Sequence, residues 1–152
     1  MTLQEFLVKA KAAGYATAGE RLEIVRPDGG KELSYREGSF EYLDRYYGFN
    51  PFAGTEVVWS HGAVAWMMSY YGAVTDASIS PIAVYRFLQE AMTGVSEDRP
   101  FRGPKRFVSG EYEYRDESQG DVESFTGIER IFLAGCEVYC LKYHGGLVRG
   151  GE

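Results

Sequence analysis

The feature that most constrains the fold of this chain is an internal repeat. Residues 38–74 align with residues 110–147 when one extra residue is allowed in the second segment. The two segments are identical at 11 positions, where ordinary composition would give about three by chance. Similarity at a fixed offset indicates an architecture built from similar units. The identical pairs are Gly38/Gly110, Glu41/Glu113, Tyr42/Tyr114, Asp44/Asp116, Gly48/Gly120, Phe52/Phe125, Gly54/Gly127, Glu56/Glu129, Gly62/Gly135, Tyr70/Tyr143 and Gly72/Gly145.

Both segments read as antiparallel strands joined by tight turns. Runs rich in Tyr, Val and Phe alternate with Gly-containing turns, as in a β-meander with one face exposed to water. One such tight turn is predicted at His61-Gly62. The motif Asn50-Pro51 predicts a connecting loop over residues 48–54, and the Pro/Gly/Arg-rich residues 98–108 predict another. We expect strands at about 22–26, 31–36, 39–47, 55–60, 64–71, 111–116, 128–133 and 137–144.

A helix is predicted before each meander. Residues 2–13 begin with a capping box formed by Thr2 and Glu5, and residues 80–93 begin with Ser80-Pro81. Both carry an apolar stripe at helical spacing, which needs an apolar surface to cover. We therefore expect an α+β fold made of an internally duplicated unit, one helix followed by an antiparallel β-meander, with the two helices packed on antiparallel sheet. A single continuous meander with chance similarity is the alternative.

The length of 152 residues predicts one domain spanning 1–152, with pseudo-repeats at about 1–76 and 77–148. The net charge of −6 argues against direct nucleic-acid binding, which depends on Lys and Arg contacts to phosphates. No apolar run is long enough to predict a membrane span, and Glu5 interrupts any signal-peptide core. Cys136 and Cys140 lie too far apart on one predicted strand for a disulfide, so we expect a cytoplasmic protein.

Four of the carboxylates that recur at matched positions lie next to predicted turns. They are Glu41, Glu113, Asp44 and Asp116. Paired carboxylates are typical of acid–base sites. Because each of these recurs together with its neighbouring turn, we interpret them as turn or edge-strand residues.

Positions where the two segments differ are the candidates for function. If the halves meet at a cleft, aromatic side chains would line it and a few polar groups would anchor a ligand, as in many small-molecule sites. Relaxed packing after duplication would produce the same differences. The basic loop at 99–106 could bind an anionic group, but it is better explained as a solvated loop that offsets a nearby acidic strand. The predicted ligand-binding residues are the aromatic Tyr46, Tyr47, Trp66 and Tyr71, with Asn50, Arg99, Arg102 and His144 as polar groups.

Enzyme signals are weak. The sequence contains no nucleophile elbow, phosphate loop or zinc-protease motif. Cys136, Cys140 and His144 fall on one face of a predicted strand, which leaves a metal site as a minor alternative to packing. We assign no catalytic residue, and we predict no metal and no cofactor.

Several motifs spread over nearly the whole chain resemble one family. They are Phe6-Leu7 with Ala10-Lys11 and Tyr15-Ala16, the loop 48–54, the run 66–72, the run 99–104 and Tyr143-His144-Gly145-Gly146. The chain resembles a small bacterial domain of unknown function, found alone or fused behind the helix-turn-helix domain of transcriptional regulators. The resemblance implies a sensing or effector-binding role and transfers no catalytic residue. This chain lacks a helix-turn-helix segment.

Three functional interpretations follow. The first is an effector-binding or sensing domain for a small, partly apolar molecule. The second is a protein-interaction module, such as a homodimer formed through a sheet edge or an aromatic face. The third is a small enzyme that uses His144 with a nearby carboxylate.

Overall fold

The computed structural model describes residues 1–16 and 23–150. Two helices and nine strands make up this part of the chain. In chain order they are α1 (Leu3–Ala16), β1 (Ile24–Val25), β2 (Lys31–Glu37), β3 (Phe40–Gly48), β4 (Phe52–Ser60), β5 (Ala63–Val74), α2 (Pro81–Met92), β6 (Arg106–Ser109), β7 (Tyr112–Asp121), β8 (Ser124–Leu133) and β9 (Cys136–Leu147).

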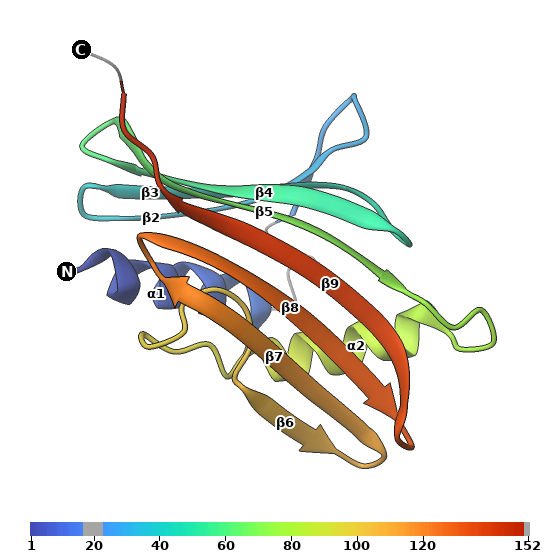
Figure 1. Ribbon diagram of the computed structural model, residues 1–152. Coiled ribbons are helices and arrows are strands. Elements are labelled where there is room, and N and C mark those ends of the chain that lie inside the picture. The colour runs from blue at the N-terminus through green and yellow to red at the C-terminus, as the bar shows by residue number, and fades with distance from the viewer. Residues whose placement is uncertain (17–22, 151–152) are drawn as a thin grey trace.

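All nine strands form one antiparallel sheet, in the order β1-β2-β3-β4-β5-β9-β8-β7-β6. The long strands β5 and β9 pair at its centre, where Tyr70 lies opposite Tyr143. The sheet is strongly twisted, and both helices lie on one side of it (Figure 1). The other side carries no helix in the described part of the chain, and we call it the open face.

The expected α+β fold of two helix-plus-meander units is therefore wrong. One continuous nine-stranded antiparallel sheet dominates the molecule, and the two helices contribute only 14 and 12 residues. Alternation of polar and apolar residues predicts strands but not which distant strands pair. The β5–β9 pairing joins the two predicted meanders into a single sheet.

Two predicted loops are also shorter than expected. Strand β3 continues to Gly48 and β4 begins at Phe52, so residues 49–51 alone connect them, and the Asn50–Pro51 peptide bond is cis. The predicted loop at 98–108 contains the start of β6, which pairs with β7 at the edge of the sheet. The predicted His61-Gly62 turn is present, with both residues at positive φ.

The helices begin as their sequences predict. The Thr2 backbone N–H donates to the Glu5 carboxylate at 2.8 Å, and the Glu5 N–H donates to the Thr2 hydroxyl at 3.1 Å, which completes a capping box. Helix α2 begins at Pro81. Proline suits the first helical position because the N–H group that it lacks would have no hydrogen-bond acceptor within the helix. Neither described helix is long and apolar enough to cross a membrane.

Aromatic contacts attach both helices to the sheet. The Phe6 ring of α1 stacks on Phe40 of β3, with ring centroids 4.9 Å apart. The Phe87 ring of α2 stacks on Tyr112 of β7 at the same distance. The sheet side chains that point toward the helices form the core, so alternate residues along each strand are buried. This buried layer between sheet and helices also contains charged groups, and these define the candidate site.

Candidate functional site

Four carboxylates lie in the middle of strands on the helix side of the sheet. Asp44 of β3 is directly opposite Glu56 of β4, and Asp116 of β7 is directly opposite Glu129 of β8. The interpretation of Asp44 and Asp116 as turn or edge residues is therefore wrong. By strand alternation each shares the face of the buried tyrosine two residues earlier.

The recurring glutamates Glu41 and Glu113 behave differently. They point to the open face, where Glu41 pairs with Arg36 at 3.1 Å and Glu113 pairs with Arg106 at 2.6 Å. These are surface ion pairs between neighbouring strands, which add little stability. Glu41 and Glu113 thus belong to the sheet surface and not to the buried site.

Two glycines let tyrosines reach the buried aspartates. Gly54 of β4 lies opposite Tyr70, and a Cβ atom there would be 2.5 Å from the Tyr70 hydroxyl. Gly127 of β8 lies opposite Tyr143, and a Cβ atom there would be 2.0 Å from that ring. Without side chains at these positions, each tyrosine crosses one strand and contacts the aspartate on the next. The Tyr70 hydroxyl donates to Asp44 at 2.5 Å, and the Tyr143 hydroxyl donates to Asp116 at 2.9 Å.

We call the group around Asp116 and Glu129 the closed cluster. Both carboxylates are fully buried. Arg102 donates two hydrogen bonds to Glu129, at 3.1 and 2.9 Å. The Tyr114 and Tyr139 hydroxyls also donate to Glu129, and Arg99 lies 3.6 Å from Asp116. Every carboxylate in this cluster has both a cation and a hydroxyl donor. The closed cluster comprises Asp116, Glu129, Tyr114, Tyr139, Tyr143, Arg99 and Arg102.

We call the group of Asp44, Glu56, Tyr70 and Lys11 the open cluster. The Lys11 ammonium of α1 lies 3.0 Å from Glu56 and also donates to the backbone carbonyl of Phe101. Among the described residues, no hydroxyl donates to the Glu56 carboxylate. The Trp66 indole occupies the position that matches Tyr139 in the repeat, and its N–H donates to the Val122 carbonyl at 3.0 Å instead. The open cluster therefore has fewer donors than the closed one.

Burial shifts the pKa values of these groups. It raises the pKa of Asp44 to about 7, and the nearby Glu56 carboxylate adds to the shift. Burial, with Glu129 as the charged neighbour, likewise raises the pKa of Asp116 to about 7. Burial lowers the pKa of Lys11 despite its pairing with Glu56. Titratable groups shifted by burial and a specific charged neighbour are typical of functional sites.

The two aspartates differ in what lies beside them. Asp116 is 1% exposed, whereas Asp44 is partly exposed and lines a pocket of about 320 Å³. The pocket lies between α2, the end of α1 and the β2–β5 part of the sheet. Its size is that of a small-ligand site. Asp44 is thus a carboxyl group with a pKa near 7 that a bound molecule can contact.

The pocket wall is mainly aromatic and apolar. Phe49 and Phe52 meet the Tyr85 ring edge to face, with centroids 5.2 and 5.6 Å away, and Phe52 lies 6.1 Å from Tyr70. Leu88 and Met92 of α2 complete the apolar side. This combination of aromatic wall and few polar groups is common in small-molecule sites.

Three of the predicted ligand-binding residues belong to this pocket or its wall. Tyr46 and Arg102 line it. Asn50 acts indirectly, because its side-chain oxygen accepts from the Tyr85 hydroxyl at 2.8 Å and from the Val74 N–H at 2.7 Å. These bonds fix the loop that carries Phe49 and the ring of Tyr85 in the wall.

Three other predicted residues have structural contacts elsewhere. Trp66 is completely buried and stacks on Phe125, so it is a core residue. The exposed Tyr47 donates to Asp28 at 2.8 Å. Arg99 donates to the Asp116 backbone carbonyl at 2.9 Å, within the closed cluster. The prediction that a ligand stacks on Trp66 does not fit this burial.

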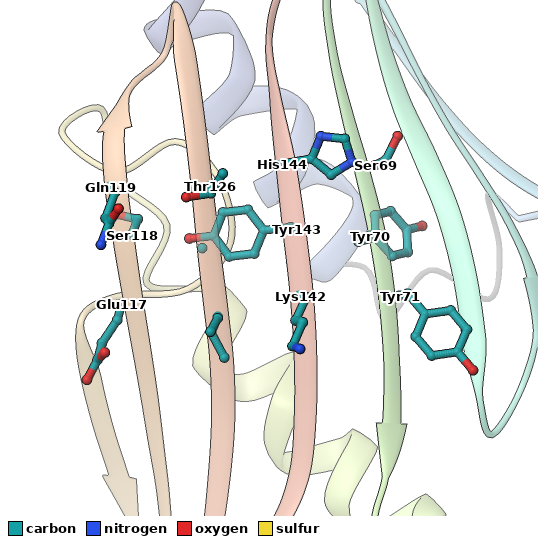
Figure 2. Close-up of a pocket in the computed structure, with 12 residues that line it drawn as sticks. Ser69, Tyr70, Tyr71, Glu117, Ser118, Gln119, Thr126, Lys142, Tyr143 and His144 are labelled. Atoms are coloured by element: carbon teal, nitrogen blue, oxygen red, sulfur yellow. The ribbon is translucent and has the colours of Figure 1, made fainter.

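Tyr71 and His144 lie together, but on the open face. They line a broad trough of about 710 Å³ that crosses β5, β9, β8 and β7. Figure 2 shows His144 beside Ser69, with Tyr71 and Lys142 further along the same strands. The Tyr71 side chain is 61% exposed. The trough is larger than the pocket, but its lining is a solvated sheet surface, whereas the pocket is lined by a carboxyl group of raised pKa and by aromatic rings. We therefore place the candidate site in the pocket.

No metal centre accompanies these groups within residues 1–16 and 23–150, where no three His, Cys, Asp or Glu side chains are placed to share an ion. Both cysteines are free.

Sequence reasoning missed the central group of the site, Asp44, and its wall residues Phe49, Phe52, Tyr70 and Tyr85. A signal for Asp44 was present. The repeat preserves an Asp, a Gly-x-Glu and a Tyr at matched positions, and alternation from Tyr42 places Asp44 on the buried face. The wall residues Phe49 and Tyr85 come from a hairpin and a helix, and only the fold brings them together.

The comparison with known families gives one result. Residues 44–148 match the family model described as a domain of unknown function, DUF5680. The chain belongs to this family. The matched region begins at Asp44 in β3 and extends through β9, so both carboxylate pairs of this DUF5680 domain lie within it. No curated protein and no solved structure matches the chain.

Proposed function

We propose that this DUF5680 domain binds a small, partly apolar molecule in the pocket beside Asp44 and thereby acts as a sensing or effector-binding domain of the cytoplasm. The observation that supports the proposal is the pocket itself, which combines an aromatic wall with a partly exposed carboxyl group whose pKa is about 7. The resemblance to domains attached to transcriptional regulators motivates the sensing role.

Comparison with the closed cluster indicates that Asp44 has a role beyond stabilising the fold. A purely structural carboxylate pair would be expected to have the full set of donors that Glu129 and Asp116 have. Among the described residues, Asp44 instead receives one tyrosine hydroxyl, and it lines the pocket. The incomplete pairing beside a cavity favours a ligand as the missing partner.

The first test is native mass spectrometry of the purified protein, compared with its denatured mass. We expect an added mass that leaves on denaturation. If the protein is purified without a bound ligand, a thermal-shift screen of small aromatic and alicyclic compounds extends the test.

A blocking variant localises any binding to the pocket. Gln89 lines the pocket from α2, and the adjacent Glu90 is exposed and does not line it. Gln89→Trp should abolish binding, whereas Glu90→Trp should not, and both should leave the free energy of unfolding within about 0.5 kcal/mol of the parent. Equal binding by both variants would place the ligand elsewhere and contradict the proposal.

A further inference from the structure

The buried charges on the helix side of the sheet do not balance. Among the described residues, this layer contains four carboxylates: Asp44, Glu56, Asp116 and Glu129. It contains three cations: Lys11, Arg99 and Arg102. With every group ionised, the layer therefore carries one more negative than positive charge.

The ion pairs show which carboxylate is left over. Lys11 pairs with Glu56 at 3.0 Å, Arg102 with Glu129 at 2.9 Å, and Arg99 lies 3.6 Å from Asp116. No Lys or Arg of the described chain forms an ion pair with Asp44. Lys11 and Arg102 lie near enough to lower the pKa of Asp44, but burial and Glu56 outweigh them. The unmatched negative charge is thus the one that lines the pocket.

Three other charged groups among the described residues line the pocket, and none of them pairs with Asp44. Arg102 is one of them, and it pairs with Glu129. Glu23 and Lys31 both line the pocket and contribute one charge of each sign. Glu23 accepts from the Tyr46 hydroxyl at 2.5 Å, and the Lys31 ammonium lies 5.7 Å from the Tyr46 ring centroid. These contacts place both groups beside Tyr46 on β3, and neither forms an ion pair with Asp44 in the part of the chain that the structure describes.

The pocket wall is suited to a positive charge. The rings of Phe49, Phe52, Tyr70 and Tyr85 surround the space beside Asp44. Aromatic faces attract organic cations, most strongly where water is excluded. A carboxylate next to several rings therefore favours an ammonium group over a neutral or anionic one.

We infer that the ligand of this pocket carries one positive charge, an ammonium or amidinium group on an apolar body, and that this group pairs with the Asp44 carboxylate. The inference rests on the proposed function, because it names the chemical class of the ligand in the same pocket. Since burial raises the pKa of Asp44 to about 7, binding below that pH also releases a proton from this carboxyl.

The test uses matched triads of compounds that differ only in charge. One triad is benzylamine, benzyl alcohol and benzoate, and others carry the same groups on cyclohexylmethyl and naphthylmethyl bodies. We expect the amine of at least one triad to bind about tenfold more tightly than its alcohol at pH 8, and the carboxylate to bind least, in calorimetric titrations. Between pH 8 and pH 6 the preference for the amine should fall by roughly tenfold as Asp44 becomes protonated.

Two variants attribute the preference to Asp44. In Asp44→Asn, amine and alcohol should bind equally, whereas Asp116→Asn, which alters the closed cluster, should keep the parent's preference. Should Asp44→Asn fail to fold, titrations of the parent at pH 6.5 in two buffers of different ionisation enthalpy still decide, because amine binding must release a proton and alcohol binding must not.

The outcomes separate the two proposals. If an alcohol or carboxylate binds as well as its amine, and Gln89→Trp blocks that binding, the pocket is a ligand site and the inference about charge is wrong. If no compound of any triad binds the parent at pH 8, the inference fails, and the added mass in native spectra then decides the proposed function by itself.

Discussion

The closed cluster and the open cluster contain the same pair of carboxylates at matched strand positions, yet their surroundings differ. Glu129 receives a bidentate arginine and two tyrosine hydroxyls, whereas Glu56 receives one lysine. Asp116 is sealed beneath Arg99 and Tyr143, whereas Asp44 lines a pocket. Similar chemistry can therefore stabilise the fold where every carboxylate oxygen has a hydrogen-bond donor, and remain available to a ligand where a carboxyl group lines a pocket.

A single exchange explains much of this difference. The position occupied by Tyr139 in the closed cluster is occupied by Trp66 in the open one, so a hydroxyl donor to the glutamate is replaced by an indole that bonds elsewhere. The cations also differ in type, because Arg102 presents a planar fork to Glu129 and Lys11 presents a point charge to Glu56.

The largest effect is expected from removing the arginine that pairs with Glu129 in the closed cluster. Arg102→Met leaves Glu129 buried without its cation and should destabilise the protein by about 3 to 5 kcal/mol, measured by urea unfolding at pH 7. Glu129→Gln in the same chain should recover part of this loss, because Tyr114 and Tyr139 donate to different oxygens of Glu129. The amide of Gln can accept from one of these hydroxyls and donate its N–H to the oxygen of the other, without a buried charge. A stability equal to that of the parent in Arg102→Met would show that the buried pair contributes nothing.

The next effect concerns the uncompensated charge of Asp44. Because its folded pKa of about 7 is above the unfolded value of 3.8, the folded state holds a proton between these values, and stability is lost as the pH rises through this range. Asp44→Asn removes this loss. Relative to the parent, the variant should gain about 2 to 3 kcal/mol of stability between pH 5 and pH 8.

Asp116→Asn sharpens the same comparison. The pKa of Asp116 is also raised to about 7, so its variant should show the same trend of relative stability with pH in urea unfolding. The two variants should differ in ligand binding alone, where only Asp44→Asn has an effect. A pH-independent stability difference for Asp44→Asn would mean that this carboxyl is ionised normally in the folded protein.

A smaller loss is expected when an alanine replaces either strand glycine. Gly54→Ala and Gly127→Ala should each cost about 1 to 3 kcal/mol in thermal unfolding, since the new Cβ would overlap Tyr70 or Tyr143. The nearest atoms to a Cβ at Gly127 all belong to the Tyr143 side chain, so Tyr143→Ala should partly rescue Gly127→Ala. At Gly54 the Arg45 backbone carbonyl is equally close, so Tyr70→Ala should rescue less. Equal rescue at both sites would contradict this geometry.

The smallest effect is expected on the open face. Tyr71→Ala and His144→Ala change exposed side chains in the trough and should leave pocket binding within twofold of the parent and stability within about 0.5 kcal/mol. Isothermal titration with the best-binding triad compound provides the measurement. A large loss of binding in either variant would move the site from the pocket to the trough.

Several parts of the fold followed from sequence patterns. The capping box at Thr2, the Ser80-Pro81 helix start and the His61-Gly62 turn are encoded by a few adjacent residues, and the structure confirms all three. The fold class was wrong because the pairing of β5 with β9 joins strands more than 60 residues apart in the chain, as with Tyr70 and Tyr143. Periodicity does not report on such pairing.

The sequence also predicted only some of the residues of the candidate site. Tyr46, Asn50 and Arg102 were predicted from the sequence and lie in the pocket or its wall, while Tyr71 and His144 share a different hollow on the other face. Trp66 was predicted as a ligand platform because it differs between the two repeats, but its indole is buried in the core. Divergence between matched positions identifies a changed contact and does not say whether a ligand or the protein makes that contact.

By itself the sequence determined most of the strands, the His61-Gly62 turn, both helix starts and the recurring Asp, Gly, Glu and Tyr, because each depends on local backbone chemistry or on residue spacing. Only the tertiary structure decided that β5 and β9 join all strands into one sheet, that Lys11, Arg99 and Arg102 pair with Glu56, Asp116 and Glu129, and that the partly exposed Asp44 lines a pocket. The reason is physical: the ionisation of a buried carboxyl depends on burial and on charges brought near it from distant segments, and neither is a property of its neighbours in the sequence.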